Sequence, residues 1–221
     1  MELTAIAQFL NTTFAAFDQS VLAWLHEAAA STNNALTPLM KLLGYTSMDG
    51  IMLYILSGVL MLFKRTRRVG LCTFGAICCG ALITNLILKP IALRPRPYEH
   101  LPQVMEWLKF VGGELEPDSA FPSGHTTAAM ACVTTLFLYS KRKSVTWTAF
   151  LYPFAVAFSR CYLMAHHPSD VLAALVIGGA SAVIAYPIAN GIFVLLRRFD
   201  NVPLFRFLLN ADFMGGKPRK K

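Results

Sequence analysis

Five stretches of this chain contain no Asp, Glu, Lys or Arg, and they limit the fold more than any other feature. They are 50–63, 69–88, 119–140, 144–159 and 171–196. Uncharged apolar segments near or above ~18 residues are typical of membrane-spanning helices. The composition agrees, because 55% of the residues are hydrophobic and only 14% are charged, whereas a soluble domain carries about 25% charged residues. The sequence therefore predicts an all-α integral membrane protein.

The basic residues are gathered at the ends of these segments. Most of them fall in four clusters, at 64–68, 141–143, 197–206 and 217–221. Each cluster borders or follows an apolar segment, and clusters of this kind mark the cytoplasmic side of a membrane protein. The net charge of +8 therefore indicates topology, and we expect no nucleic-acid partner.

The chain divides into three parts by this pattern. Residues 1–46 are apolar but interrupted by polar residues, and they predict either one imperfect span or helices lying in the membrane interface. Residues 47–198 predict the transmembrane core, which brings the bundle to about six helices. Within it, 90–121 is a long loop rich in Pro and acidic residues, and loops of this length are usually functional or disordered. Residues 199–221 predict a basic cytoplasmic tail.

The stretch from Ser159 to Asp170 carries the strongest chemical pattern. Proline suits the first turn of a helix, so a helix starting near Pro168 would place Asp170 within about a turn of His166. A carboxylate on one ring nitrogen raises the basicity of the other, which makes histidine a nucleophile or a general base. Arg160 would add a bidentate site for phosphate oxygens. The alternative is an ordinary loop with a solvated histidine pair.

Two other stretches lie at the same ends of the predicted spans. Lys89 to Pro97 holds three cations among prolines, which could simply anchor a helix at the interface. Phe121 to Thr127 places Ser123 as an N-cap before an uncharged span, with Gly124 allowing close backbone approach. A helix N-terminus of this kind can bind an anion, although an ordinary capped helix has the same pattern.

Taken together, the three stretches bring cations, histidines, an aspartate and a helix N-terminus to one face of the membrane. Phosphoryl transfer needs these groups: cations for the phosphoryl oxygens, a nucleophile, a group that orients it and a proton donor. No carboxylate cluster or His/Cys set predicts a metal site, and no cofactor is expected.

The motifs Lys-x6-Arg-Pro, Pro-Ser-Gly-His and Ser-Arg-x5-His-x3-Asp occur in this order at Lys89–Pro97, Pro122–His125 and Ser159–Asp170. This combination resembles the type 2 phosphatidic acid phosphatases (PAP2), whose site is shared with vanadium haloperoxidases and acid phosphatases. The resemblance covers about 47–196 and implies a PAP2/haloperoxidase-like helical core.

The resemblance also implies a role for each motif residue. His166 would attack phosphorus and become a phosphohistidine, Asp170 would orient it, and His125 would protonate the leaving group. The phosphoryl oxygens would be bound by Lys89, Arg96, Ser123, Gly124 and Arg160. Arg94 lies outside the motif and is expected to contact a second phosphate or the headgroup.

From these roles we expect a bacterial cell-membrane enzyme that hydrolyses a lipid phosphate or pyrophosphate at the extracytoplasmic face, without metal. Undecaprenyl pyrophosphate is the favoured substrate, because an outward site and the extra Arg94 suit a diphosphate. The alternatives are a phosphatidylglycerophosphate or phosphatidate phosphatase, a lipid phosphotransferase, and, from other classes, a transporter or an inactive lipid-binding protein. The lipid substrate and the bilayer are the expected partners, and no protein partner is predicted.

Overall fold

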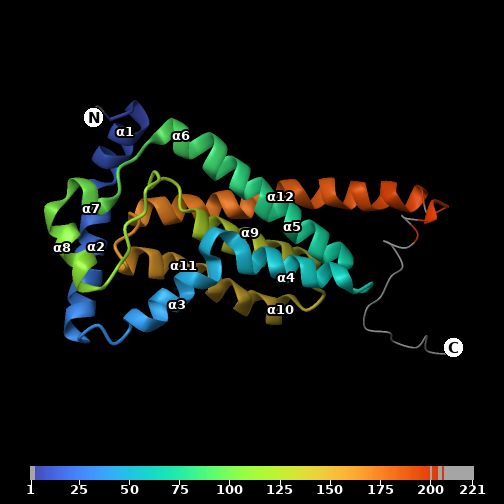
Figure 1. The fold of residues 1–221 in the computed structure, drawn as a ribbon, viewed down its shortest axis with the longest axis horizontal. Helices are drawn as coiled ribbons and strands as arrows, with labels where there is room; N and C mark the ends of the chain where they lie inside the picture. Colours follow the sequence, from blue (N-terminus) through green and yellow to red (C-terminus); the bar gives the residue numbers. More distant parts are fainter. Residues whose placement is uncertain (1–2, 200, 204–205, 207–221) are drawn as a thin grey trace.

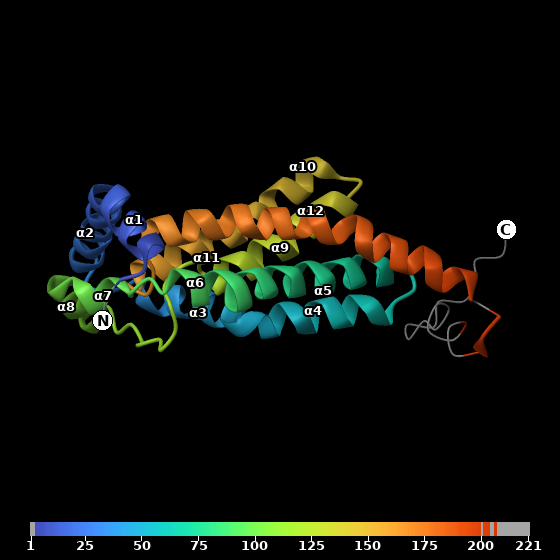
Figure 2. The same cartoon turned by 90° about the horizontal axis from the view of Figure 1, so that it is seen from above.

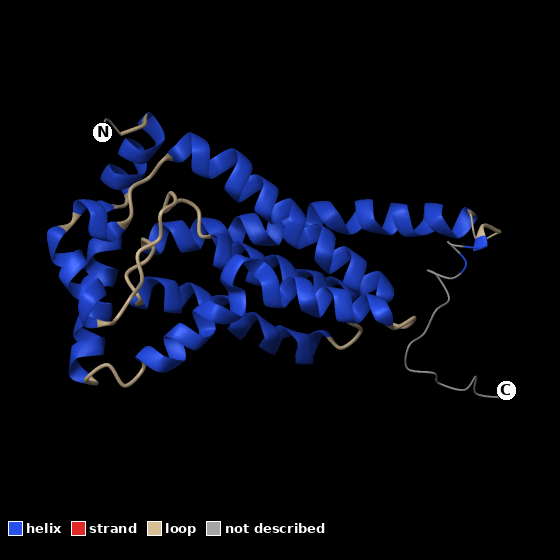
Figure 3. Ribbon diagram, in the orientation of Figure 1, coloured by secondary structure: helices blue, strands red, loops and turns tan. Residues whose placement is uncertain are grey.

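The structure is a computed structural model that describes residues 3–199, 201–203 and 206. Within these residues the regular structure is helical, with no strand (Figure 3). The predicted all-α membrane bundle is therefore confirmed as a fold class.

Five helices run along the long axis of the molecule and form its core (Figures 1 and 2). They are α4 (Ile51–Leu62), α5 (Arg67–Ala81), α9 (Gly124–Tyr139), α11 (Leu151–Tyr162) and α12 (Pro168–Arg198). The helix α12 packs against α5 and α9, and α5 also packs against α4. Small residues allow these close contacts: a Cβ atom on Gly178 would lie 2.5 Å from the carbonyl oxygen of Thr127.

The number of membrane spans remains a prediction. By length and composition, two helical stretches of the described chain can cross a membrane, Arg67–His100 and Pro168–Arg198. A third would be the pair α3 (Thr37–Ser47) and α4, which are bent by 53°. The remaining core helices are shorter, and α11 is preceded by the short helices α10 (Lys143–Thr146) and η3 (Trp147–Phe150).

The end of the second predicted span has an unusual helical geometry. The helix α5 continues into a π-helix, η2 (Leu82–Leu88), and then into α6 (Lys89–Ala92). Such i→i+5 turns are rare and are found mostly at functional sites. Leu93 then takes a left-handed conformation, with φ of 47°, and ends the helix just before the arginines of the first motif.

The N-terminal segment lies across one end of the bundle (Figures 1 and 2). It forms α1 (Ala5–Thr13) and α2 (Ala15–Ser31), followed by a turn in which Asn33 and Asn34 have positive φ. The helix α2 contacts α11 and α12. The helix α2 does not run parallel to the core helices (Figures 1 and 2).

The prediction of a long loop at 90–121 is wrong for its middle part. This part forms α7 (Pro97–His100) and α8 (Pro102–Phe110), each with a proline in its first turn. The buried Val104 and Leu108 of α8 lie four residues apart and pack in one cluster with residues of α2 and α11. This apolar face makes the middle of the segment fold, and irregular backbone remains at 93–96, at 101 and at 111–123.

The motif stretches and the basic clusters lie at opposite ends of the bundle. The motif residues are near α6 and the start of α12, whereas the turn after α4 and the turn after α9 lie at the other end (Figure 1). At that end Arg65, Lys141 and Arg142 line one shallow cavity. The predicted basic tail falls almost entirely outside the described residues.

Candidate active site

The three motif stretches converge on one pocket with a volume of about 510 Å³. It lies among α3, α4, η2, α9 and α11 and is covered by the irregular segment after α8. The motif residues that line it are Lys89, Gly124, His125, Arg160 and His166. Residues more than 70 positions apart in the chain therefore share one cavity.

Both predicted helix starts are confirmed. The hydroxyl of Ser123 accepts a hydrogen bond from the backbone N–H of Thr126, and α9 begins at Gly124. The helix α12 begins at Pro168, and Asp170 accepts a hydrogen bond of 2.9 Å from the backbone N–H of His167. Each cap satisfies an N–H group that has no partner within its own helix.

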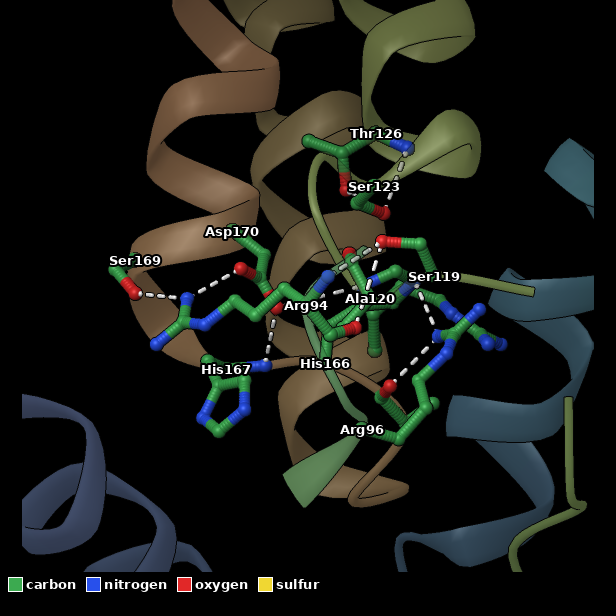
Figure 4. Close-up of polar contacts among 12 residues, drawn as sticks. Arg94, Arg96, Ser119, Ala120, Ser123, Thr126, His166, His167, Ser169 and Asp170 are labelled. Atoms are coloured by element: carbon green, nitrogen blue, oxygen red, sulfur yellow. Dashed lines mark hydrogen bonds and ion pairs between the residues drawn. The ribbon is translucent and has the colours of Figure 1, made fainter. Parts of the chain in front are cut away.

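The ring of His166 is held by a backbone carbonyl. Its Nδ1 lies 2.7 Å from the carbonyl oxygen of Ala120 (Figure 4), and its Nε2 lies 3.0 Å from Nη1 of Arg96. A neutral imidazole that donates from Nδ1 keeps its lone pair on Nε2. The contacts therefore place the lone pair of the His166 ring on Nε2, facing Arg96.

Asp170 does not accept the hydrogen bond of His166 that the sequence suggested. Its Oδ2 lies 3.8 Å from Nδ1 of His166, because its oxygens are already used by the His167 N–H and by Arg94. At 3.8 Å a carboxylate still stabilises a positive charge on the ring by Coulomb attraction. Asp170 thus contacts His166 only by its charge, whereas the hydrogen bond at Nδ1 belongs to Ala120.

The environment of His166 favours a neutral ring. Burial lowers the pKa of His166 well below its usual range, and the positive charges of Arg96 and Arg160 lower it further. A histidine with so low a pKa is neutral at neutral pH, and its Nε2 lone pair accepts a hydrogen bond from Arg96. The same charges that would bind phosphate therefore keep the His166 ring unprotonated.

Two carboxylates of the segment after α8 are bound to the motif cations. Glu116 pairs with Arg160 and lies 2.8 Å from Arg96. Asp118 pairs with Lys89 and lies 2.5 Å from Arg96. The sequence showed these residues only as part of an acidic loop, but here they occupy donors that phosphate oxygens would need.

Lys89 and Arg96 keep the Asp118 carboxyl ionised. Burial alone would raise the pKa of Asp118, but the hydrogen bond and charge of Lys89 and the charge of Arg96 outweigh it, so the pKa lies below its usual value. Asp118 is therefore ionised at neutral pH and competes with an anionic substrate.

Arg94 does not reach the pocket, which argues against its expected contact with a second phosphate. The side chain is 1% exposed and lies on the far side of the His166 loop (Figure 4). Its donors bond to Asn11 at 2.8 Å, Asp18 at 2.8 Å, Ser169 at 2.8 Å and Asp170 at 2.5 Å. These bonds use four of the five N–H groups of the guanidinium inside the protein.

The two adjacent histidines have separate environments. His167 does not line the pocket; its Nε2 lies 3.3 Å from the carbonyl oxygen of Pro95, and its ring lies 5.3 Å from that of His100. His125 and His166 both line the pocket. This placement agrees with the motif register, which assigned His166 as the nucleophile.

Sequence reasoning missed two polar residues near the site. Asn85 lies in the π-helix and lines the pocket with Lys89, and Asp18 of α2 is buried against Arg94. Each is a polar residue inside an apolar stretch, and that was the available signal, because burying an unpaired polar group costs free energy.

Comparison with known proteins gives a family and several relatives. A family model described as the PAP2 superfamily matches residues 70–193. A lipid A 4'-phosphatase of Porphyromonas gingivalis is 27% identical over 122 residues, 53% of this chain and 51% of the relative. The undecaprenyl-diphosphatase BcrC of Bacillus subtilis is 30% identical over 101 residues, 44% of this chain and 47% of the relative.

A further relative and one solved structure extend the comparison. An undecaprenyl-diphosphatase of Sulfolobus acidocaldarius is 27% identical over 158 residues, 63% of this chain and 71% of the relative. The crystal structure of Aquifex aeolicus LpxE matches with a TM-score of 0.57 and 25% identity, covering 68% of this chain and 84% of that one. The alignment spans about half the length of the first two relatives.

Proposed function

This chain belongs to the PAP2 superfamily, and we propose that it hydrolyses a lipid phosphate or pyrophosphate through a phosphohistidine. The observation that carries the proposal is the placement of His166. Its Nε2 is oriented by the Ala120 carbonyl at Nδ1 and lies beside Arg96, in a pocket that also holds His125, Lys89 and Arg160.

The first step transfers the phosphoryl group to the enzyme. Nε2 of His166 attacks phosphorus, the bond from phosphorus to the leaving oxygen breaks, and His125 gives that oxygen a proton. The ring of His166 becomes positively charged in this step, and the charge of Asp170 at 3.8 Å stabilises it.

The second step releases phosphate. A water molecule attacks the phosphohistidine, His125 takes a proton from that water, and the P–N bond breaks so that the electron pair returns to Nε2. The products are inorganic phosphate and the neutral His166 that began the cycle.

Cations of the protein supply the charge that both steps require. Lys89, Arg96 and Arg160 would bind the phosphoryl oxygens after these displace Glu116 and Asp118, with Gly124 and the Ser123-capped start of α9 beside them. Because positive charge is already present around the phosphate, we propose that no metal ion is needed.

For the substrate, we propose undecaprenyl pyrophosphate. Beyond its charged end the pocket is lined by Tyr54, Ile77, Ala81 and Ala128, which suits a phosphate attached directly to a hydrocarbon chain. Relatives named undecaprenyl-diphosphatase support this choice. Because Arg94 is buried, it no longer supports a diphosphate over a monophosphate. The choice of undecaprenyl pyrophosphate therefore rests on the apolar lining of the pocket.

A lipid A-type phosphate is the second candidate. It is favoured by the relatives named lipid A 4'-phosphatase and by polar residues of the pocket, such as Lys41 and Tyr45, which could bind a sugar. For either substrate we propose that the pocket faces away from the cytoplasm, since the basic clusters lie at the other end of the bundle.

The test is phosphate release by the purified protein in detergent. Undecaprenyl pyrophosphate, lipid A, phosphatidate and phosphatidylglycerophosphate are offered one at a time, with His166→Ala as the control. We expect turnover of undecaprenyl pyrophosphate above the others, and none by the variant. Preference for lipid A would select the second candidate, and a folded protein that releases phosphate from no lipid would overturn the proposal.

A further inference from the structure

Asp18 lies 52 residues before the region that the family model matches, yet it is part of the structure beneath the nucleophile. We propose that Asp18 is a positioning residue for His166, which acts by balancing Arg94 and thereby leaving the negative charge of Asp170 available to the ring. The inference rests on the proposed function, because it concerns the same nucleophile.

The contacts of Asp18 join three parts of the chain. Its Oδ2 lies 2.8 Å from Nη2 of Arg94 and 2.7 Å from the hydroxyl of Ser169. Its Oδ1 accepts a hydrogen bond of 2.8 Å from the backbone N–H of Ser169. The Asp18 side chain is only 3% exposed, so these partners replace water.

The bond to Ser169 fixes the start of α12. Ser169 is the second residue of this helix, and its N–H has no partner within the helix. Asp18 provides that partner from α2, 151 positions away. Because Asp170 is the next residue, the same contact fixes the carboxylate that faces His166.

The second contribution of Asp18 is its negative charge. Arg94 pairs with both Asp18 and Asp170, and all three side chains are at most 3% exposed. One guanidinium and two carboxylates leave a net negative charge beside His166. Without the charge of Asp18, Arg94 would neutralise Asp170, and the positive charge that develops on His166 during attack would lose its compensation.

A purely structural role is the competing explanation. Asp18 could serve only to fasten α2 to the bundle, and breaking a buried ion pair then costs stability because it leaves an unpaired charge. The two explanations differ in the pH dependence of turnover, because losing a charge beside Asp170 shifts the protonation of its carboxyl, whereas losing a fastening contact does not.

The first measurement compares Asp18→Asn with the unaltered protein. We expect kcat to fall about 10- to 100-fold, the size of effect seen when supporting contacts of an active site are lost. KM should stay within about threefold, because Asp18 does not line the pocket. Asp18→Glu, which keeps the charge, should recover most of the loss.

The second measurement is the pH profile of kcat for Asp18→Asn and for the unaltered protein. The negative charge of Asp18 raises the pKa of the neighbouring Asp170 carboxyl, so its removal should move the acid limb of kcat to lower pH while kcat at neutral pH falls. A structural role lowers kcat without moving this limb, and that result would overturn the proposal. Thermal unfolding in detergent is measured for each protein.

Folding and function are separated by two further comparisons. If Asp18→Asn does not fold, Asp18→Ser is measured in the same way; failure of both to fold would establish a structural role and overturn the proposal. Glu106→Gln, at an exposed site on α8, is the matched control. Normal kcat in Asp18→Asn overturns the positioning role alone, whereas absence of turnover in the unaltered protein overturns the proposed function.

Discussion

Glu116 pairs with Arg160 across the pocket, and its second oxygen lies 2.8 Å from Arg96. One carboxylate thus binds two of the cations that the proposed mechanism assigns to phosphate. The segment after α8 lines the pocket, and under the proposed mechanism a bound phosphate would displace its carboxylates.

The first prediction concerns this competition. Glu116→Gln removes the negative charge but keeps the shape of the side chain, so phosphate should bind to Arg96 and Arg160 at lower cost. We expect KM to fall by about threefold to tenfold, equivalent to roughly 1 kcal/mol. Steady-state kinetics measures it, with Glu106→Gln as the control. A rise in KM would mean that Glu116 helps to bind the substrate.

The second prediction separates the adjacent histidines. His166→Ala should abolish both turnover and the trapped phosphoenzyme, since no bond to phosphorus can form. His167→Ala removes a buried ring outside the pocket, so it should lower the melting temperature and still form phosphoenzyme. Loss of a positioned acid–base group such as His125 should cost about 10²–10⁴ in rate. If His167→Ala is inactive while His166→Ala turns over normally, the assignment of His166 as the nucleophile is wrong.

The third prediction is a pH dependence. Burial, together with the charges of Arg96 and Arg160, keeps the pKa of His166 well below its usual range, so His166 stays neutral as the pH falls through about 6.5. The acid limb of kcat/KM should therefore lie below this pH. It should move to higher pH in Arg160→Gln, because one cation that opposes protonation of the ring is gone.

The same lowered pKa of His166 also predicts how the stability of the folded protein changes with pH. The unfolded chain binds the proton of His166 at a higher pH than the folded protein does, so stability should be full above about pH 6.5 and fall as the pH drops below it. Thermal unfolding at a series of pH values measures this. The contribution of His166 is the difference from His166→Ala, because Asp170, whose pKa burial raises to about 6, acts with the opposite sign. The absence of any difference between the two proteins would contradict the shift at His166.

The fourth prediction concerns metal ions. Activity should persist in excess chelator, because Lys89, Arg96 and Arg160 supply the positive charge that a metal site would otherwise provide. Vanadate should inhibit as a mimic of the trigonal-bipyramidal transition state. Loss of activity in chelator, with recovery on adding Mg²⁺, is the contrary result.

The fifth prediction tests the orientation in the membrane. A membrane-impermeant thiol reagent should label Glu106→Cys, at the motif end, in intact cells. Ser144→Cys, at the basic end, should react only after lysis. The unaltered chain, which has free cysteines of its own, gives the background. The reverse pattern would place the pocket on the cytoplasmic side.

Local features of the sequence were sufficient for the core helices and for the motif residues, although they missed α7 and α8. A helix is encoded by consecutive residues, so uncharged apolar runs, Ser123 as an N-cap and Pro168 in a first turn all predicted structure correctly. The motif residues were likewise recognisable by spacing. His125, His166, Lys89 and Arg160 line one pocket because each follows or precedes such a helix at the same end of the bundle.

The partners of these residues were decided only by the tertiary structure. Ala120 instead of Asp170 accepts the hydrogen bond of His166, Arg94 is buried against Asp18, and Glu116 pairs with Arg160. These contacts join residues 44 to 76 positions apart. Charge and hydrogen-bonding groups act over a few ångströms whatever their separation in the chain, so their pairing is settled only when packing of the helices brings them together.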